Sequence, residues 1–292
     1  MKKTAILIGI ILLSLFSGYA QEARHTISLA CSGTSCEFDS RRVHQARRIV
    51  SLASSITKNL YLLEAQGRIV GCTRYCETDP ADSIPVIADA VNVNLEQVLQ
   101  LRPDIVLASG LTHPRILEGL KRLGIHTLRL NQPAHFEDIC QQLEQLGELS
   151  GKKELAMQIN RECRERLQKV QERIPEGKRP TVFFQLGADP LFTALPNTFM
   201  DDYIRLSGGI NLASGLNNGM VSKEFVLLKN PDVIFITAMG LLTQAQKKEW
   251  QKITALTAVK KDRIFLLDDS VCSPTPIIFV ETVEEMARLM SF

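Results

Sequence analysis

The fold is decided by the stretch Glu96–Ala108, which reads EQVLQLRPDIVLA, and by a second stretch of the same form, Glu224–Ile236, which reads EFVLLKNPDVIFI. Each stretch predicts an acid-bearing helix that ends at a Pro-Asp pair and leads directly into a buried strand. The two glutamates lie 128 residues apart. A helix–strand unit duplicated at this distance indicates two similar α/β lobes rather than one core. Two lobes form a cleft, and such clefts are common ligand sites.

The composition agrees with two domains and argues against one class of partner. The chain has 292 residues, of which 45% are hydrophobic, and a formal net charge of +2. This length and apolar content are sufficient for two domains of ordinary size. Because the net charge is close to zero, no broad surface for a polyanion is indicated, and nucleic acid is not an expected partner.

The N-terminus has the parts of a secretory signal. Lys2-Lys3 is the charged region, Ala5–Phe16 is an apolar run, and Gly18-Tyr19-Ala20 places small residues before a cleavage point. We expect cleavage after Ala20, a periplasmic location and conditions that permit disulfides. Lipid anchoring at Cys31 is the less favoured alternative, because Cys31 lies about fifteen residues past the apolar run.

The remaining sequence alternates short predicted strands with helices, which favours mostly parallel sheets covered on both faces. Lys152–Arg173 lacks Pro and Gly and is charged on most sides, so it predicts a bridging helix about 33 Å long. Gly187–Phe192 is predicted to be a loop. The predicted fold is α/β, with two Rossmann-like lobes joined by one long rigid helix. The predicted segments are a signal peptide (1–20), a loose N-terminal segment (21–47), an N-terminal lobe (48–150), the linking helix (151–174) and a C-terminal lobe (175–292).

Nothing in the sequence indicates catalysis. The chain has no G-x-S-x-G elbow and no phosphate-binding loop of the G-x-x-x-x-G-K-[ST] type. Among its five histidines only His113 and His135 follow predicted strands, where open sheets bind ligands. An exported metal-dependent enzyme that uses these two histidines is kept as the alternative from another class. We expect a protein that is not an enzyme and holds no metal of its own.

A binding protein makes better use of the loops that follow the strands. In the predicted cleft, aromatic side chains could stack on a flat ligand. His113 could either ligate the metal centre of a bound ligand or cap a helix. The candidate ligand residues in these loops are Tyr75, His113, Asp189, Phe192, Asp268 and Asp269.

Glu96 and Glu224 form a matched pair of acids. Each lies early in its predicted helix, where a carboxylate is favoured by the helix dipole. That reason explains one glutamate but not the same placement in both lobes. Two matching acids, one in each lobe, predict docking onto a partner that has two basic patches.

Several short motifs give the chain a family resemblance over about residues 48–292. In the second lobe they are Val182–Gly187, Pro190, Phe192-Thr193, Gly208-Gly209, Asn211 and Val221–Glu224; in the first they are Tyr75, Pro80, Asn94–Glu96 and Pro103-Asp104. Together they resemble the periplasmic solute-binding proteins of ABC importers, in the class that carries cobalamin, haem and ferric siderophores. The resemblance is strongest to its cobalamin binders. It implies that Glu96 and Glu224 dock onto arginines of a membrane permease, and that Tyr75 and Phe192 line the cleft.

The departures from the family pattern concern the ligand. Tryptophans of the cobalamin binders align with Ala90, Ser109 and Asn218, and another aligns near Asp269. Asn218 is therefore added to the candidate ligand residues. Fewer aromatic side chains mean less apolar contact with a corrin ring. The expected cargo is a metal chelate: cobalamin or a related corrinoid first, with haem or a ferric siderophore as the alternative. A surface scavenger without a permease is a further alternative.

Two cysteines are also assigned to the cleft by the resemblance. Cys76 and Cys272 align with loops that flank it from opposite lobes. The hypothesis is that they form a disulfide across the cleft or act as soft ligands.

Overall fold

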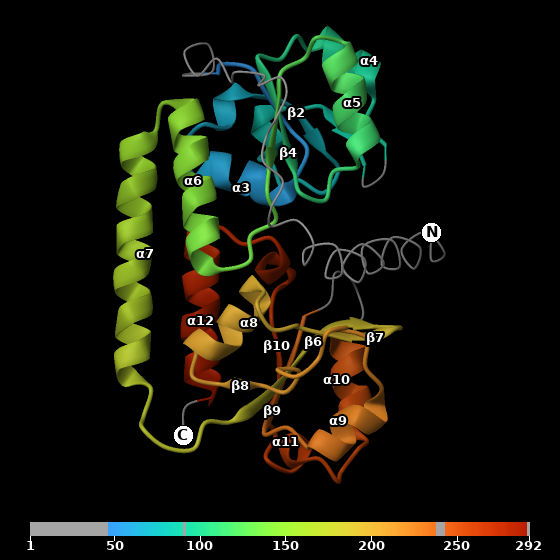
Figure 1. Ribbon diagram of the computed structural model, residues 1–292, viewed down its shortest axis with the longest axis vertical. Helices are drawn as coiled ribbons and strands as arrows, with labels where there is room; N and C mark the ends of the chain where they lie inside the picture. Colours follow the sequence, from blue (N-terminus) through green and yellow to red (C-terminus); the bar gives the residue numbers. More distant parts are fainter. Residues whose placement is uncertain (1–45, 90–91, 238–242, 291–292) are drawn as a thin grey trace, which may run out of the picture. The chain divides into compact units, whose positions relative to one another are not determined.

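The computed structural model describes residues 46–89, 92–237 and 243–290. The predicted signal peptide, most of the loose N-terminal segment, Cys31 and Ala90 lie outside these ranges. The described chain forms two compact units (Figure 1). The first unit contains the described residues up to Pro133 together with Glu137–Arg161, and the second contains Ala134–Phe136 and the residues from Glu162 onward.

The first unit is built on a five-stranded parallel sheet with the order β3-β2-β1-β4-β5. Helices α4 and α5 cover one face, where their apolar side chains join the core, and α3 packs on the strands from the other. The strands are β1 (Ile49–Ser51), β2 (Ile69–Thr73), β3 (Val86–Ala88), β4 (Ile105–Ser109) and β5 (Thr127–Leu130). The helices are α3 (Ser54–Leu62), α4 (Leu95–Gln100), α5 (Pro114–Arg122) and α6 (Phe136–Ser150).

The second unit has β6 in the middle of its sheet. Strands β9 and β10 continue the sheet in parallel on one side, while β7 and the short β8 pair with different ends of β6 on the other. The strands are β6 (Thr181–Ala188), β7 (Leu191–Thr193), β8 (Ile210–Asn211), β9 (Val233–Ile236) and β10 (Ile264–Leu266). The helices are α8 (Phe199–Leu206), α9 (Lys223–Lys229), α10 (Thr243–Gln251), α11 (Thr257–Lys260) and α12 (Pro276–Met290). The predicted two-lobed α/β fold with mostly parallel sheets is confirmed.

One local prediction is wrong. The segment Gly187–Phe192 is a β-hairpin and not a loop, because β6 continues to Ala188 and β7 returns antiparallel to it. Asp189 and Pro190 form the two-residue turn between the strands. The run Leu191–Thr193 is too short for its periodicity to indicate a strand, and pairing with β6 supplies what the sequence pattern lacks.

Helix α7 (Lys153–Arg173) follows a turn in which Gly151 has a left-handed backbone (φ +65°). The chain passes from the first unit to the second within this helix. The sequence predicts a bridging helix here, and the structure adds that a stripe of side chains along it is buried: Ala156, Ile159, Cys163, Leu167 and Val170. Spacings of three and four residues put this stripe on one face, so α7 is an amphipathic packing helix.

The duplicated stretch builds the same local structure in both units. Asn94 and Ser222 cap the helices α4 and α9, each accepting a hydrogen bond from the backbone N–H three residues on. Each helix is then stopped by a residue in the left-handed region, Arg102 (φ +45°) or Asn230 (φ +46°), directly before the proline. This backbone conformation turns the chain out of the helix and into the strand.

The aspartate of each Pro-Asp pair ties the new strand to the first strand of its sheet. The carboxylate of Asp104 accepts the backbone N–H groups of Arg47 (2.7 Å) and Arg48 (2.9 Å), just before β1. The carboxylate of Asp232 accepts the backbone N–H (3.0 Å) and the hydroxyl (2.9 Å) of Thr181, the first residue of β6. The repeated sequence therefore encodes a repeated junction between two neighbouring parallel strands.

Within the described ranges, no helix is long and apolar enough to cross a membrane.

Candidate functional site

In the first unit, the loop after β2 carries Tyr75 and Cys76. The backbone N–H of Cys76 donates to the carbonyl of Thr73 (3.0 Å), which closes a tight turn. Tyr75 is 43% exposed at the tip of this turn. The ring is therefore presented to solvent from the carboxyl end of a parallel strand, as a stacking residue requires.

The sulfur of Cys76 is surrounded by hydrogen-bonding groups. It lies 3.0 Å from the hydroxyl oxygen of Thr57 and 3.3 Å from that of Thr73, and it forms a hydrogen bond with the thiol of Cys72. The interaction with Cys72 has the largest effect and lowers the pKa of Cys76 to about 6. Burial opposes this shift, and the hydrogen bonds from Thr57 and Thr73 add to it. The interaction between the two cysteines also raises the pKa of Cys72. The sequence reasoning missed this cluster, for which the only signal is the Cys72–Cys76 spacing at a strand end.

His113 follows β4 and is the N-cap of α5. Its Nδ1 accepts the backbone N–H of Arg115 (3.2 Å), and the residue is exposed. A neutral imidazole whose Nδ1 accepts a hydrogen bond carries its proton on Nε2. In this state the free face of His113 offers a hydrogen-bond donor rather than a lone pair for a metal.

In the second unit, the β6–β7 hairpin and the turn beside it bring three predicted residues together. Asp189 is exposed in the hairpin turn, whereas Phe192 is buried. A Cβ atom on Gly219 would lie 2.6 Å from the ring of Phe192, so that glycine packs directly on the ring. Asn218 is exposed, and its side-chain oxygen accepts the backbone N–H of Met220 (3.0 Å). Phe192 thus packs beneath the Asn218 turn, and its contact with a ligand stays a prediction.

The loop after β10 holds the remaining predicted residues of the second unit. Asp268 caps the short helix Asp269–Cys272 by accepting the backbone N–H of Ser270 (2.9 Å), and both Asp268 and Asp269 are exposed. The sulfur of Cys272 lies 3.9 Å from the hydroxyl of Thr237, at the end of β9. Each of Cys76 and Cys272 is described here within its own unit, and a disulfide between them stays a prediction.

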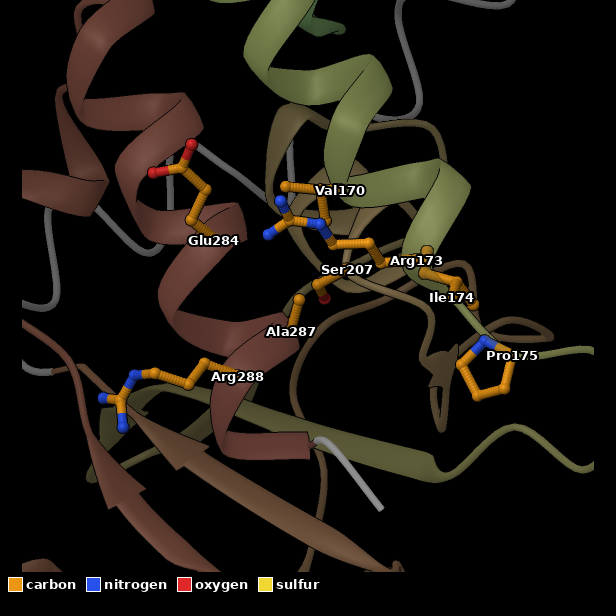
Figure 2. A pocket seen from close by; sticks show the side chains of 8 residues that line it. All are labelled: Val170, Arg173, Ile174, Pro175, Ser207, Glu284, Ala287 and Arg288. Atoms are coloured by element: carbon orange, nitrogen blue, oxygen red, sulfur yellow. The ribbon is translucent and has the colours of Figure 1, made fainter.

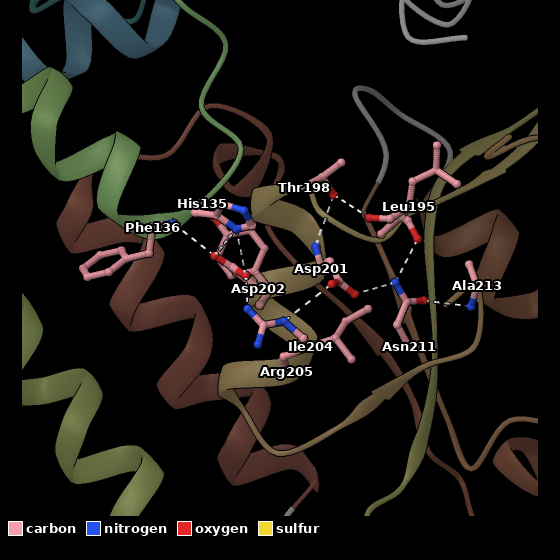
Figure 3. Close-up of polar contacts among 12 residues, drawn as sticks. His135, Phe136, Leu195, Thr198, Asp201, Asp202, Ile204, Arg205, Asn211 and Ala213 are labelled. Atoms are coloured by element: carbon pink, nitrogen blue, oxygen red, sulfur yellow. Dashed lines mark hydrogen bonds and ion pairs between the residues drawn. The ribbon is translucent and has the colours of Figure 1, made fainter. Parts of the chain in front are cut away.

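His135, the second histidine of the enzyme alternative, is part of a structural cluster (Figure 3). Its Nδ1 lies 3.3 Å from the carboxylate of Asp202, which is buried. The same carboxylate accepts the backbone N–H of Phe136 (3.1 Å) and the guanidinium of Arg205 (2.5 Å). Asp202 therefore serves the start of α6, and these contacts account for His135 without a catalytic role.

Glu96 and Glu224 occupy the same position, the second residue of a capped helix. Both are exposed. The hydroxyl of Ser222 donates to the carboxylate of Glu224 and, together with the local backbone, holds the pKa of that carboxyl below its usual value. One helical turn further on, each helix exposes a leucine: Leu99 is 49% exposed and Leu227 is 37% exposed. Both helices thus present a carboxylate next to an apolar side chain.

The described residues contain no cluster of metal ligands, and one cavity lies away from the predicted ligand residues. In these ranges no three His, Cys, Asp or Glu side chains are close enough to hold a metal ion. A cavity of about 340 Å³ lies in the second unit between the end of α7 and α12 (Figure 2). It is lined by Val170, Arg173, Ile174, Pro175, Ser207, Glu284, Ala287 and Arg288, and it includes none of the predicted ligand residues.

The chain is similar to known binding proteins over most of its length. Residues 49–271 match the model of the family described as "Periplasmic binding protein". The vitamin B12-binding protein of Vibrio cholerae is 29% identical over 236 residues, which cover 79% of this chain and 84% of that protein. An ABC transporter substrate-binding lipoprotein of Bacillus subtilis, YvrC, is 29% identical over 256 residues, which cover 84% of this chain and 80% of that one.

Solved structures of periplasmic binding proteins have the same fold as this chain. The periplasmic vitamin B12-binding protein BtuF of Vibrio cholerae superposes with a TM-score of 0.71 at 27% identity, covering 84% of this chain and 96% of that one. The periplasmic heme-binding protein HutB of the same organism has the same fold, with a TM-score of 0.76 at 20% identity, covering 85% of this chain and all of that one. The resemblance predicted from the sequence motifs is confirmed. The chain belongs to the periplasmic binding protein family.

Proposed function

We propose that this protein is the exported solute-binding component of an ABC importer, which captures a metal chelate and delivers it to a permease through Glu96 and Glu224. The family consists of transport components and not of enzymes, so the metal-dependent-enzyme alternative is abandoned. The observation that carries the proposal is the matched pair of helices α4 and α9, one in each unit, with the same cap, the same acid and the same exposed leucine.

The matched helices have the properties of a docking surface. A carboxylate at the second position of a helix is favoured by the helix dipole, so it can point to solvent without cost to the fold. Exposed carboxylates attract arginines of a partner and set its orientation. Leu99 and Leu227 add apolar area beside the charge, which an interface core requires and a solvated surface does not.

For the cargo, the similarity to vitamin B12-binding proteins favours cobalamin or a related corrinoid. Haem is the second candidate, because proteins of the same fold bind it. We assign ligand contact to the exposed loop residues. Tyr75 provides an aromatic face and His113 a hydrogen-bond donor, while Asn218 is polar where cobalamin binders have tryptophan. The other exposed residues so assigned are Asp189, Asp268 and Asp269. Phe192 is buried in β7 and is kept as a ligand residue only on the family motif. The polar side chains suit the hydrogen-bonding groups at the periphery of a chelate.

The proposed role in an importer also implies that the protein is exported. A chelate carrier for an importer works outside the cytoplasmic membrane, and the similar B. subtilis protein is described as an ABC transporter substrate-binding lipoprotein. We therefore keep residues 1–20 as a signal peptide and a periplasmic location, with lipid anchoring at Cys31 as the less favoured form.

The docking proposal is tested with the double variant Glu96→Ala/Glu224→Ala. The importer from the same genome is reconstituted, and its binding-protein-dependent ATP hydrolysis and ligand uptake are measured. We expect at least a tenfold loss of stimulation with unchanged ligand affinity, and a loss of wild-type stimulation as salt screens the charges.

The matched control is Glu118→Ala/Glu285→Ala. These two exposed glutamates lie on α5 and α12, one in each unit, so the control makes the same change in net charge on helices other than α4 and α9. Wild-type activity in the Glu96/Glu224 variant, or an equal loss in the control, contradicts docking through these helices.

A further inference from the structure

We propose that Cys72 and Cys76 form a thiol–disulfide exchange site, in which Cys76 attacks a small-molecule disulfide and Cys72 resolves the mixed disulfide to close a Cys72–Cys76 bond. The site does not depend on the identity of the transported ligand. It lies in the first unit, at the end of β2, in the turn that presents Tyr75.

The two thiols differ in the way that attacking and resolving cysteines must differ. Cys72 lies on β2 and is 1% exposed, whereas Cys76 lies in the turn and is partly exposed. In the parallel sheet Cys72 is the register partner of Ser51, whose hydroxyl lies 2.8 Å from that of Thr57, and the Thr57 hydroxyl lies 3.0 Å from the sulfur of Cys76. The two cysteines therefore border the same group of buried hydroxyls. A reagent in solution can therefore reach Cys76 first, and Cys72 is positioned to attack only after Cys76 has reacted.

The hydroxyl groups around Cys76 form a cradle that suits a thiolate. Thr57 and Ser51 are fully buried, and Thr73 is nearly so. The hydroxyl of Thr57 lies 2.8 Å from that of Ser51 and 3.0 Å from the sulfur of Cys76. A hydroxyl has one proton. Ser51 donates its own proton to the carbonyl of Ala53 (3.2 Å), so Thr57 is the donor toward both Ser51 and the sulfur. When Thr57 gives its proton to the sulfur, it stabilises the negative charge of a Cys76 thiolate.

The acidity of the sulfur agrees with this geometry. The hydrogen bonds around Cys76 lower its pKa to about 6, mainly through Cys72, so the thiolate predominates at neutral pH. Cys140 and Cys163 are buried, and burial raises the pKa of Cys163 to about 11. They serve as internal controls for reactivity.

The exchange is balanced in thiols and electrons. The Cys76 thiolate attacks one sulfur of a disulfide RSSR, forms the mixed disulfide Cys76–S–SR and releases RS⁻. The Cys72 sulfur then attacks the sulfur of Cys76, forms the Cys72–Cys76 bond and releases the second RS group, which takes the proton of Cys72. The two cysteines lose two electrons, and RSSR becomes two thiols.

The test uses the mature full-length protein and oxidised glutathione. After exposure and blocking of remaining thiols, tryptic peptides are mapped without reduction. Trypsin cleaves after Arg74, so Cys72 lies in the peptide Ile69–Arg74 and Cys76 in a separate peptide that begins at Tyr75. We expect these two peptides to be joined by a disulfide. In Cys72→Ser the resolving thiol is absent, and we expect glutathione to stay attached to Cys76.

Two results overturn the proposal. One is a Tyr75 peptide that is joined to the peptide containing Cys272, which would support the pairing between the two units instead. The other is a Cys76 that is still fully alkylated after exposure to the disulfide, at the same level as Cys140 and Cys163.

A second measurement tests whether Cys76 reacts because the surrounding hydroxyl groups lower its pKa or only because it is exposed. The pH dependence of iodoacetamide labelling at Cys76 is measured in Cys72→Ser, where serine keeps a donor beside the sulfur, and in the same background with Thr57→Val. A lowered pKa also reduces nucleophilicity, so the midpoint is more informative than the rate at one pH. We expect a midpoint well below that of an ordinary thiol and an upward shift with Thr57→Val. An ordinary midpoint in both variants contradicts the cradle.

Discussion

Removal of the Asp232 carboxylate is expected to destabilise the second unit. In Asp232→Ala the backbone N–H and hydroxyl of Thr181, at 3.0 Å and 2.9 Å, lose their shared acceptor at the start of β6. A hydrogen bond to a charged group contributes about 1.5–3 kcal/mol net. Because both donors share one oxygen and the site is partly solvated, we take about 2 kcal/mol for the pair. For a chain of this size that corresponds to a fall in Tm of about 4–8 °C.

The pH dependence gives this prediction a distinctive signature. Burial raises the pKa of Asp232, but the donors of Thr181 and the nearby lysines outweigh it and lower the pKa below the ordinary value of 3.8. An acid with a depressed pKa stabilises the fold above its unfolded pKa and loses that contribution as the pH falls through the folded pKa. The difference in Tm between wild type and Asp232→Ala is therefore full at neutral pH and shrinks below about pH 4.

Scanning calorimetry from pH 7 to pH 3 measures both effects. Asp232→Asn keeps one acceptor oxygen and is expected to lose less stability. Asp104→Ala is the equivalent change in the first unit and removes the acceptor of two backbone N–H groups. Because Asp104 is exposed, water can replace the carboxylate, and we expect a smaller loss of stability than in Asp232→Ala. A Tm within about 1 °C of wild type for Asp232→Ala at neutral pH, or a difference that does not change with pH, would contradict this role of Asp232.

Two further predictions concern packing in the second unit. Asp202→Asn leaves the backbone N–H of Phe136 and the half-exposed side chains of His135 and Arg205 without a charged acceptor, and about 2 kcal/mol of stability should be lost in urea unfolding; an unchanged midpoint would show that the cluster is not structural. Gly219→Ala places a Cβ atom 2.6 Å from the ring of Phe192 and should cost about 1–3 kcal/mol, whereas Gly215→Ala, which meets nothing within 4 Å, should be neutral. Equal stability of the two alanine variants would contradict the packing at Phe192.

The sequence predicted the fold well because the signals are local and repeated. Asn94 and Ser222 are good caps, the prolines end the helices, and the apolar runs after Asp104 and Asp232 can only be buried strands. The role of the two aspartates was not predictable. It depends on a hydrogen bond to a strand 51 to 57 residues away, and no spacing along the chain records such a contact.

Three structural details were not predicted from the sequence, and each has a physical cause. The composition of α7 is so polar that its buried stripe is diluted, and only the spacing from Ala156 to Val170 reveals it. The β6–β7 hairpin is too short for a periodic signal. Phe192 was assigned to the cleft by its motif, and its packing against Gly219, twenty-seven residues later, could not be foreseen; its contact with a ligand stays a prediction.

The candidate site was predictable only as a set of loops. Strand ends predicted where Tyr75, His113 and Asp268 would be exposed. The surroundings of Cys76 were not predictable, because its hydroxyl donors come from α3 and β2 and gather only in the folded sheet. Family resemblance supplied the docking role of Glu96 and Glu224, and the equal geometry of their helices gives that role physical support.

The most direct test of the central claim is a ligand titration of the purified mature protein. Cyanocobalamin, haemin and a panel of ferric siderophores are added in turn, and binding is followed by visible absorbance and equilibrium dialysis. Ligand absorbance is the safer signal, because Trp250 is buried against Phe183 and far from solvent. The account predicts saturable one-to-one binding of one metal chelate, first of all cyanocobalamin, with a Kd of about 1 µM or tighter. No saturable binding of any chelate would contradict the claim that this protein carries one.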